Sequence, residues 1–105
     1  MINVNELPIA NVSQQYWNKR SIDINFDLNN MGYQLYVSQD KKGVFSPTEI
    51  FHITNIQQCP YCDGSEAGCD GLKKYKKDFF HRLIGFPSIR LEWLYLAYEP
   101  KKETH

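Results

Sequence analysis

Residues 21–38 read SIDINFDLNNMGYQLYVS, and this stretch decides the fold. In its first half, apolar side chains alternate with Asp and Asn, which is the pattern of a strand with one buried face. Residues 29–32 (NNMG) follow and tolerate the positive φ angles of a tight turn. A second alternating run then places Tyr33, Leu35 and Val37 on one face. The sequence therefore predicts an antiparallel β-hairpin over 21–38.

The helical pattern of the chain is concentrated in residues 72–84. Asp70 is a residue type that caps helix starts, and Gly85 followed by Pro87 is typical of a helix end. We therefore predict one main amphipathic helix over 72–84. Its apolar face consists of Leu72, Tyr75, Phe79, Leu83 and Ile84.

Three further segments are less distinctive. Residues 88–98 are apolar on both faces, so periodicity does not separate a strand from a buried helix, but their length and aromatic content favour a strand. Residues 46–49 (SPTE) match a capping box and predict a short helix over 46–54, although the β-branched and aromatic residues after them equally suit a strand. Residues 13–19 fit a short helix.

Together these elements predict the α+β class. A small antiparallel sheet, made of the hairpin 21–38 and a strand near 88–98, packs against the helix 72–84. The length of 105 residues predicts a single globular domain over 1–105, because it lies near the commonest domain size. Residues 100–105 form a polar C-terminal tail.

Composition limits the classes of function. Twelve basic and twelve acidic residues cancel, so the chain as a whole has no electrostatic attraction to a polyanion. The sequence contains neither a membrane-spanning apolar run nor a secretory signal, and its odd cysteine number does not make a disulfide framework. We therefore expect a cytoplasmic protein without a membrane partner. Abundant Asn, Ile, Lys and Tyr are typical of AT-rich coding, which is common in bacterial mobile elements and phages.

The most distinctive local motif is Cys59-Pro60-Tyr61-Cys62, which is followed by Cys69 among several glycines. A C-x2-C pair directs two thiolates at one metal ion, and three cysteines in eleven residues make a structural zinc site a candidate. A closed site needs a fourth ligand. We assign His52, which lies seven residues before Cys59, as that ligand. The alternatives are His81 and the carboxylates Asp63, Glu66 and Asp70. Because the sequence contains only half of a four-cysteine zinc motif, it favours buried or idle free thiols over a bound zinc ion.

The tetrapeptide Cys-Pro-Tyr-Cys also resembles the active-site motif of glutaredoxins. That resemblance implies thiol-disulfide exchange. The resemblance covers four residues only. The sequence after the motif does not predict the helix that should begin there and lower the pKa of the attacking thiol. We therefore expect no redox enzyme.

Four lysines surround Tyr75 at the start of the predicted helix, on the face opposite its apolar residues. Such a face contacts nucleic-acid phosphates in some proteins and is a solvated surface in many others. The candidate phosphate contacts are Lys73, Lys74, Lys77 and Arg82.

Three classes of function follow. Small size, neutrality and many aromatic residues favour a non-enzymatic protein-binding module, such as an inhibitor, an immunity protein or an accessory factor. The first alternative is a zinc-stabilised nucleic-acid-binding domain that uses the cysteine loop and the lysine-rich face. The second is a small enzyme without a linear motif. The sequence holds no recognisable catalytic motif, which counts against this alternative without excluding it.

Overall fold

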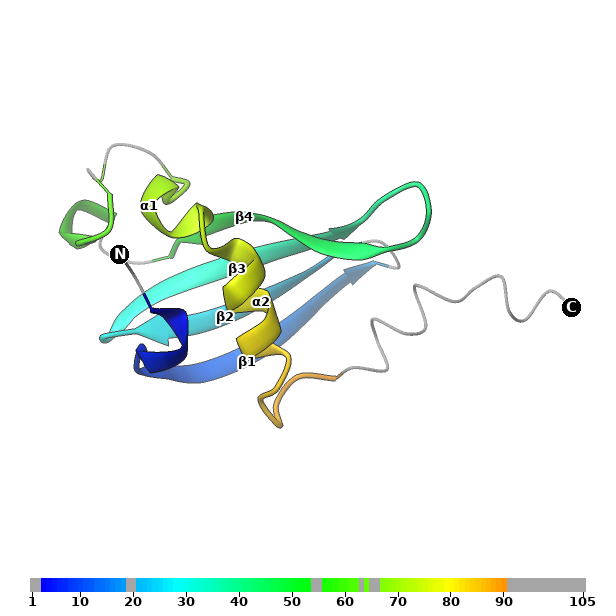
Figure 1. Ribbon diagram of the computed structural model, residues 1–105, viewed down its shortest axis with the longest axis horizontal. Coiled ribbons are helices and arrows are strands. Elements are labelled where there is room, and N and C mark those ends of the chain that lie inside the picture. The colour runs from blue at the N-terminus through cyan, green and yellow to red at the C-terminus, as the bar shows by residue number, and fades with distance from the viewer. Residues whose placement is uncertain (1–2, 19–20, 54–55, 63, 65–66, 91–105) are drawn as a thin grey trace, which may run out of the picture.

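A computed structural model describes residues 3–18, 21–53, 56–62, 64 and 67–90, and all structural statements below refer to these residues. They form an α+β fold in which a four-stranded sheet carries short helices on one face (Figure 1). The α+β class and the antiparallel sheet predicted from the sequence are confirmed. In chain order the elements are η1 (Val4–Glu6), β1 (Ile9–Asn18), β2 (Ser21–Leu28), β3 (Met31–Gln39), β4 (Phe45–His52), η2 (Ile56–Gln58), α1 (Asp70–Lys73) and α2 (Lys76–Leu83).

The sheet is an antiparallel meander in the order β1-β2-β3-β4. The predicted hairpin is its centre, with an unbroken register from Ser21 opposite Ser38 to Leu28 opposite Met31. Asn29 and Asn30 form the turn with φ angles of 53° and 68°. Asn accepts this left-handed conformation more readily than most residues, which explains the tight connection.

The core lies between the sheet and the helices. The apolar side chains that alternate along β2 and β3 are buried in one cluster with Leu72, Phe79 and Leu83. The helices α1 and α2 cover this face of the sheet (Figure 1). Phe79 and Leu83 of α2 are fully buried, as their spacing predicts, and the Phe79 ring lies 5.5 Å from that of Phe26. The helical layer is thus fixed to the middle of the hairpin.

The helix predicted over 46–54 is wrong, because residues 46–52 belong to strand β4, which pairs with β3, and residue 54 lies outside the described residues. The β-branched and aromatic residues of the segment outweigh its capping-box pattern. Pro47 is accommodated opposite Val37 beside a register shift, on an edge strand where its missing N–H costs little. The helix predicted over 13–19 is also wrong, because β1 extends to Asn18 and pairs with β2.

The helix predicted over 72–84 is present but divided. Tyr75 leaves the helical conformation, with φ −109° and ψ 20°, and separates α1 from α2. Cys69, rather than Asp70, is the N-cap residue of α1. The interruption lets α1 follow the cysteine loop while α2 packs Phe79 and Leu83 against the sheet.

The strand predicted near 88–98 stays a prediction. Ser88 and Ile89 lie in a turn, where the Ser88 hydroxyl donates to the Val12 carbonyl at 2.7 Å and Ile89 is buried. Residues 91–98 and the tail 100–105 lie outside the described residues. In the part of the chain that the structure describes, no helix combines the length and the apolar character needed to cross a membrane.

Candidate metal centre

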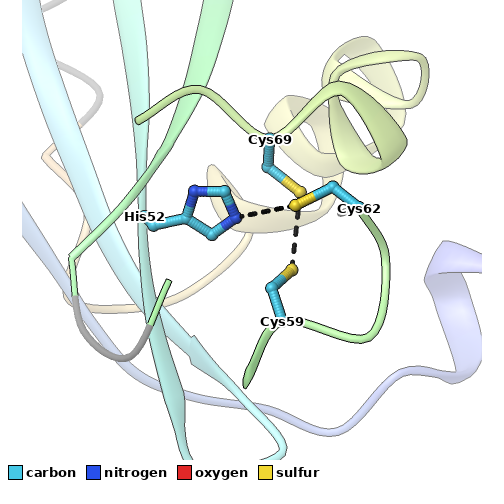
Figure 2. Close-up of side chains that lie close together, drawn as sticks. All are labelled: His52, Cys59, Cys62 and Cys69. Carbon is cyan, nitrogen blue, oxygen red and sulfur yellow. Dashed lines mark hydrogen bonds between the residues drawn. The ribbon is translucent and has the colours of Figure 1, made fainter. Parts of the chain in front are cut away.

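The structure brings together one histidine and three cysteines: His52, Cys59, Cys62 and Cys69 (Figure 2). Their ligand atoms all lie within 4.8 Å of one another, close enough to bind a metal ion. These are the four residues that the sequence assigns to a zinc site. The alternative ligand His81 points to solvent from α2, and Asp70 is exposed at the start of α1, so neither belongs to the group.

Backbone pairing positions two of the four side chains. His52 is the last residue of β4, and its N–H donates to the Ala67 carbonyl at 2.9 Å. The N–H of Cys69 donates to the Ile50 carbonyl at 2.8 Å. Residues 67–69 therefore lie along the outer edge of β4, which places His52 and Cys69 on adjacent segments at the same end of the sheet.

A close approach of two backbones positions the cysteine loop. A Cβ atom at Gly71 would lie 1.5 Å from the carbonyl oxygen of Tyr61, a distance that no side chain tolerates. Glycine at this place in α1 lets the Cys59–Cys62 loop pack directly on the helix. The Cys59 and Cys62 sulfurs thereby reach Cys69, and the Cys59 and Cys69 sulfurs lie 3.7 Å apart.

The distances fit a tetrahedral zinc ion. Zinc–sulfur bonds of about 2.3 Å and zinc–nitrogen bonds of about 2.0–2.1 Å require roughly 3.8 Å between two sulfurs and roughly 3.5 Å between sulfur and nitrogen. The Cys59–Cys69 separation is 3.7 Å, and Cys62 Sγ lies 3.2 Å from His52 Nε2. Separations at the 4.8 Å limit would need to close by about 1 Å.

The orientation of His52 is fixed by a hydrogen bond outside the group. Nδ1 lies 2.8 Å from the Ala67 carbonyl oxygen, which only accepts, so Nδ1 carries the proton. Nε2 then presents its lone pair toward Cys62 Sγ. A histidine that binds a metal through one nitrogen and donates to a backbone carbonyl through the other has the usual outer-shell arrangement of metal sites.

Backbone N–H groups point at the sulfurs. The Gly64 N–H donates to Cys62 Sγ at 3.3 Å, and the Tyr61 N–H donates to Cys59 Sγ. Both donors follow their cysteine by two residues, and Gly64 reaches this geometry with a φ of 73°, which suits glycine. Such donors stabilise the negative charge of a thiolate, which is the metal-binding form of cysteine.

The cysteines ionise unequally. Burial opposes ionisation of Cys59, but hydrogen bonds led by that from the Tyr33 hydroxyl lower its pKa to about 7. Burial and the nearby Cys59 raise the pKa of Cys69 to about 12, and burial also raises the pKa of Cys62. One thiolate therefore forms readily at neutral pH. A cation must displace the protons of the other two, so metal binding releases protons.

Tyr33 is the functional residue that the sequence analysis misses. Its side chain is fully buried, and its hydroxyl oxygen lies 3.0 Å from Cys59 Sγ. Burial and the hydrogen bond to Cys59 raise the pKa of Tyr33 well above its ordinary value, so the hydroxyl keeps its proton. One feature of the sequence could have pointed to Tyr33: it is a Tyr on the inward face of the predicted hairpin, and a buried Tyr hydroxyl needs a polar partner.

The structure places three of the four candidate phosphate contacts, Lys73, Lys74 and Lys77, around one hollow, and Arg82 does not line it. Lys73 forms an ion pair with Glu49 at 3.1 Å, and the Arg82 guanidinium donates to the carbonyls of Val4 and Leu7. Lys74 and Lys77 are exposed. They contribute to an open hollow lined by Asp70, Lys73, Lys74, Lys76, Lys77 and Asp78.

Comparisons of this chain with protein-family models, with curated proteins and with solved structures found no match. Its function is therefore argued from its own residues. The group of His52 and the three cysteines is the feature with the most specific chemistry.

Proposed function

We propose that this protein is a non-enzymatic, zinc-stabilised protein-binding module. One Zn²⁺, held by His52, Cys59, Cys62 and Cys69, completes its fold. The observation that carries the proposal is the meeting of four soft or borderline donors, three sulfurs and one imidazole nitrogen, within 4.8 Å. This donor set is typical of structural zinc sites and not of calcium or magnesium sites, which use oxygen ligands.

The number of ligands favours a structural role over a catalytic one. Catalytic zinc sites keep one of four positions open for water or substrate, whereas structural sites fill all four with protein side chains. Here the four side chains account for a full tetrahedral shell. Zinc at this place stabilises the fold and leaves no coordination position for a reacting molecule.

The positions of the ligands indicate what zinc would stabilise. His52 ends β4, Cys59 and Cys62 belong to the loop after η2, and Cys69 begins α1. A single ion would therefore join the edge of the sheet, the loop and the helical layer. Segments of this size bury little apolar surface, so a metal cross-link contributes folding free energy that packing alone does not supply.

Binding to another protein is the role that best agrees with the remaining features. The net charge is zero, and aromatic residues make up 14% of the chain, which suits contact with a protein more than with a polyanion. The closed metal shell adds no catalytic position. An inhibitor, an immunity protein or an accessory factor fits this description.

The test combines metal analysis with affinity capture. Protein purified without chelators should contain about one zinc per chain by mass spectrometry, and the Cys69→Ser variant, as the matched control, should contain far less. Capture from native lysate should retain a stoichiometric protein partner after nuclease treatment. A zinc-free wild type contradicts the metal site, and a capture that retains no protein once nuclease is added contradicts the protein-binding role.

Nucleic-acid binding is the second candidate, and the lysine-lined hollow on α1 and α2 favours it. The pairing of Lys73 with Glu49, the use of Arg82 inside the fold and the presence of Asp70 and Asp78 in the same hollow weaken it. Fluorescence anisotropy with single- and double-stranded oligonucleotides over a range of salt concentrations tests it. Real phosphate contacts give an affinity that falls steeply with salt and weakens when Lys74 and Lys77 are replaced by Ala.

A further inference from the structure

Tyr33 lies beneath the metal-binding group, although it is not one of its ligands. It belongs to β3, points to the core face and is fully buried. Its ring centre lies 5.7 Å from that of His52 and 6.4 Å from that of Tyr61, while Phe26 stacks on it at 5.9 Å. These contacts fix the ring, so its hydroxyl group occupies a defined position next to Cys59.

The direction of the hydrogen bond between Tyr33 and Cys59 follows from the chemistry of the site. The two atoms lie 3.0 Å apart, and either could donate when both carry protons. A cysteine that binds a metal is a thiolate without a proton, so it only accepts. With metal bound, the Tyr33 hydroxyl is therefore the donor and the Cys59 sulfur is the acceptor.

We propose that Tyr33 is a positioning residue of the metal centre, whose hydroxyl hydrogen bond orients the Cys59 sulfur and stabilises its thiolate in the metal-bound state. This inference rests on the proposed zinc site and adds a residue from the centre of the sheet to it. Outer-shell hydrogen bonds of this kind typically change metal affinity about 10- to 100-fold. Tyr33 thus links the core of the hairpin to the stability of the metal site.

The rest of the site explains why one hydroxyl matters. Cys59 is a buried residue, so a donor lost at its sulfur is poorly replaced by solvent. Cys59 and Cys62 each receive one backbone N–H, from Tyr61 and Gly64 respectively, and the Tyr33 hydroxyl is a further donor to Cys59. Removal of the Tyr33 hydroxyl therefore acts on one thiolate and leaves the donor to Cys62 in place.

The experiment compares two Tyr→Phe variants on the same strand. Tyr33→Phe removes the proposed donor and keeps the ring, and Tyr36→Phe removes a hydroxyl from the opposite face of the sheet. Zinc affinity measured by competition with a chromophoric chelator should fall about 10- to 100-fold in Tyr33→Phe. Zinc affinity should stay within about twofold of wild type in Tyr36→Phe, because this substitution leaves the hydrogen bonds around the metal ligands intact.

A spectroscopic readout separates this role from a general loss of stability. In the cobalt-substituted protein, the sulfur-to-metal charge-transfer bands should shift in Tyr33→Phe and stay in place in Tyr36→Phe, because the hydrogen bond withdraws electron density from Cys59 Sγ. In the cadmium-substituted wild type, an NMR coupling should connect the slowly exchanging Tyr33 hydroxyl proton with the cadmium nucleus. This second measurement needs no variant, so it decides the question even if Tyr33→Phe fails to fold.

The outcomes that overturn the inference differ from those that overturn the zinc site. If wild type binds zinc and Tyr33→Phe has the same affinity and the same cobalt spectrum, the role of Tyr33 is wrong and the zinc site stands. An absent coupling in the cadmium-substituted wild type has the same meaning. If wild type binds neither zinc nor cobalt, the proposed zinc site fails and the role of Tyr33 fails with it.

Discussion

The three cysteines of the candidate metal site have the same side-chain chemistry but differ in burial. Cys69 is fully buried, Cys59 is nearly so, and Cys62 is half-buried. Because a thiolate reacts in proportion to its exposure, Cys62 is the ligand that a chelator or an oxidant reaches first. The two buried sulfurs lie behind it, 3.7 Å apart, against the core. Loss of the proposed zinc ion is therefore expected to begin at the loop and not at the sheet.

Phe79 is the residue whose truncation should cost most outside the metal centre. It is fully buried, and its ring packs at 5.5 Å from Phe26 in the hairpin. Phe79→Ala should lower the free energy of unfolding by roughly 3–5 kcal/mol, measured by urea denaturation. The matched control is Lys77→Ala on the exposed face of the same helix, which should change it by under about 0.5 kcal/mol. A loss below about 1 kcal/mol in Phe79→Ala contradicts the packing of α2.

Gly71 and Gly68 offer a paired test of the loop geometry. A Cβ atom at Gly71 would collide with the Tyr61 carbonyl at 1.5 Å, whereas one at Gly68 would meet its nearest atom, in the Glu49 side chain, at an ordinary 3.5 Å. Gly71→Ala should therefore displace the cysteine loop and weaken zinc binding at least about 10-fold, and Gly68→Ala should leave it nearly unchanged. Chelator competition measures both. Equal affinities in the two variants contradict the close packing of the loop on α1.

The members of the candidate site are predictable from the sequence to different degrees. The cysteines follow from their spacing alone, because C-x2-C is a local signal. His52 follows from sequence distance combined with the exclusion of a helical His81. Tyr33 lies 26 residues before Cys59, the side chain that it contacts. The Ala67 carbonyl lies 15 residues after His52, whose ring it contacts. Only the pairing of β3, β4 and residues 67–69 brings them together, and no local pattern reports that pairing.

At the scale of elements, the period-two alternation predicts its strands correctly, whereas the capping-box pattern predicts a helix where a strand is found. The hairpin forms as predicted because both of its strands alternate and its turn residues accept positive φ. Residues 46–49 carry a capping-box pattern, yet Glu49 pairs with Lys73 and the segment pairs with β3. Sheet pairing outweighs a local motif because it buries Ile50 and satisfies a row of backbone groups.

Amide hydrogen exchange should report the attachment of residues 67–69 to β4. The N–H groups of His52 and Cys69 both donate across this junction, and proposed zinc ligands lie on both sides of it. Removal of zinc should therefore reduce their protection by at least about 10-fold, while the central hairpin amide of Leu35 keeps its protection. NMR or mass spectrometry measures the exchange. Unchanged protection at both junction amides after removal of the metal contradicts the role of zinc as the link between β4 and α1.

At the scale of the whole molecule, the fold divides into a part that its apolar core stabilises and a part that the proposed zinc ion would stabilise. The hairpin and α2 supply an apolar core in which Phe26, Leu35 and Phe79 are buried. The 56–62 and 67–73 segments at the end of β4 contribute few large apolar side chains, and their polar loop is held by backbone pairing and by the proposed ion. The fold class is predictable because the core depends on periodic patterns. The arrangement of the loop is not predictable in the same way, because it depends on contacts between side chains that are far apart in the sequence.

Chelation provides the test of this division at the level of the whole protein. Because metal ligation and folding are linked, zinc at 100 times its Kd stabilises the folded state by about 2.7 kcal/mol. For a domain of this size, its removal should lower Tm by about 10–20 °C, measured by circular dichroism or calorimetry. Cys59→Ser, Cys62→Ser and Cys69→Ser should each lower Tm by a similar amount, and a chelator should have no further effect on them, since any missing ligand leaves the shell incomplete. A folded, metal-free wild type that ignores the chelator would refute both the zinc site and most of the case for nucleic-acid binding, and the protein-binding module would stand alone.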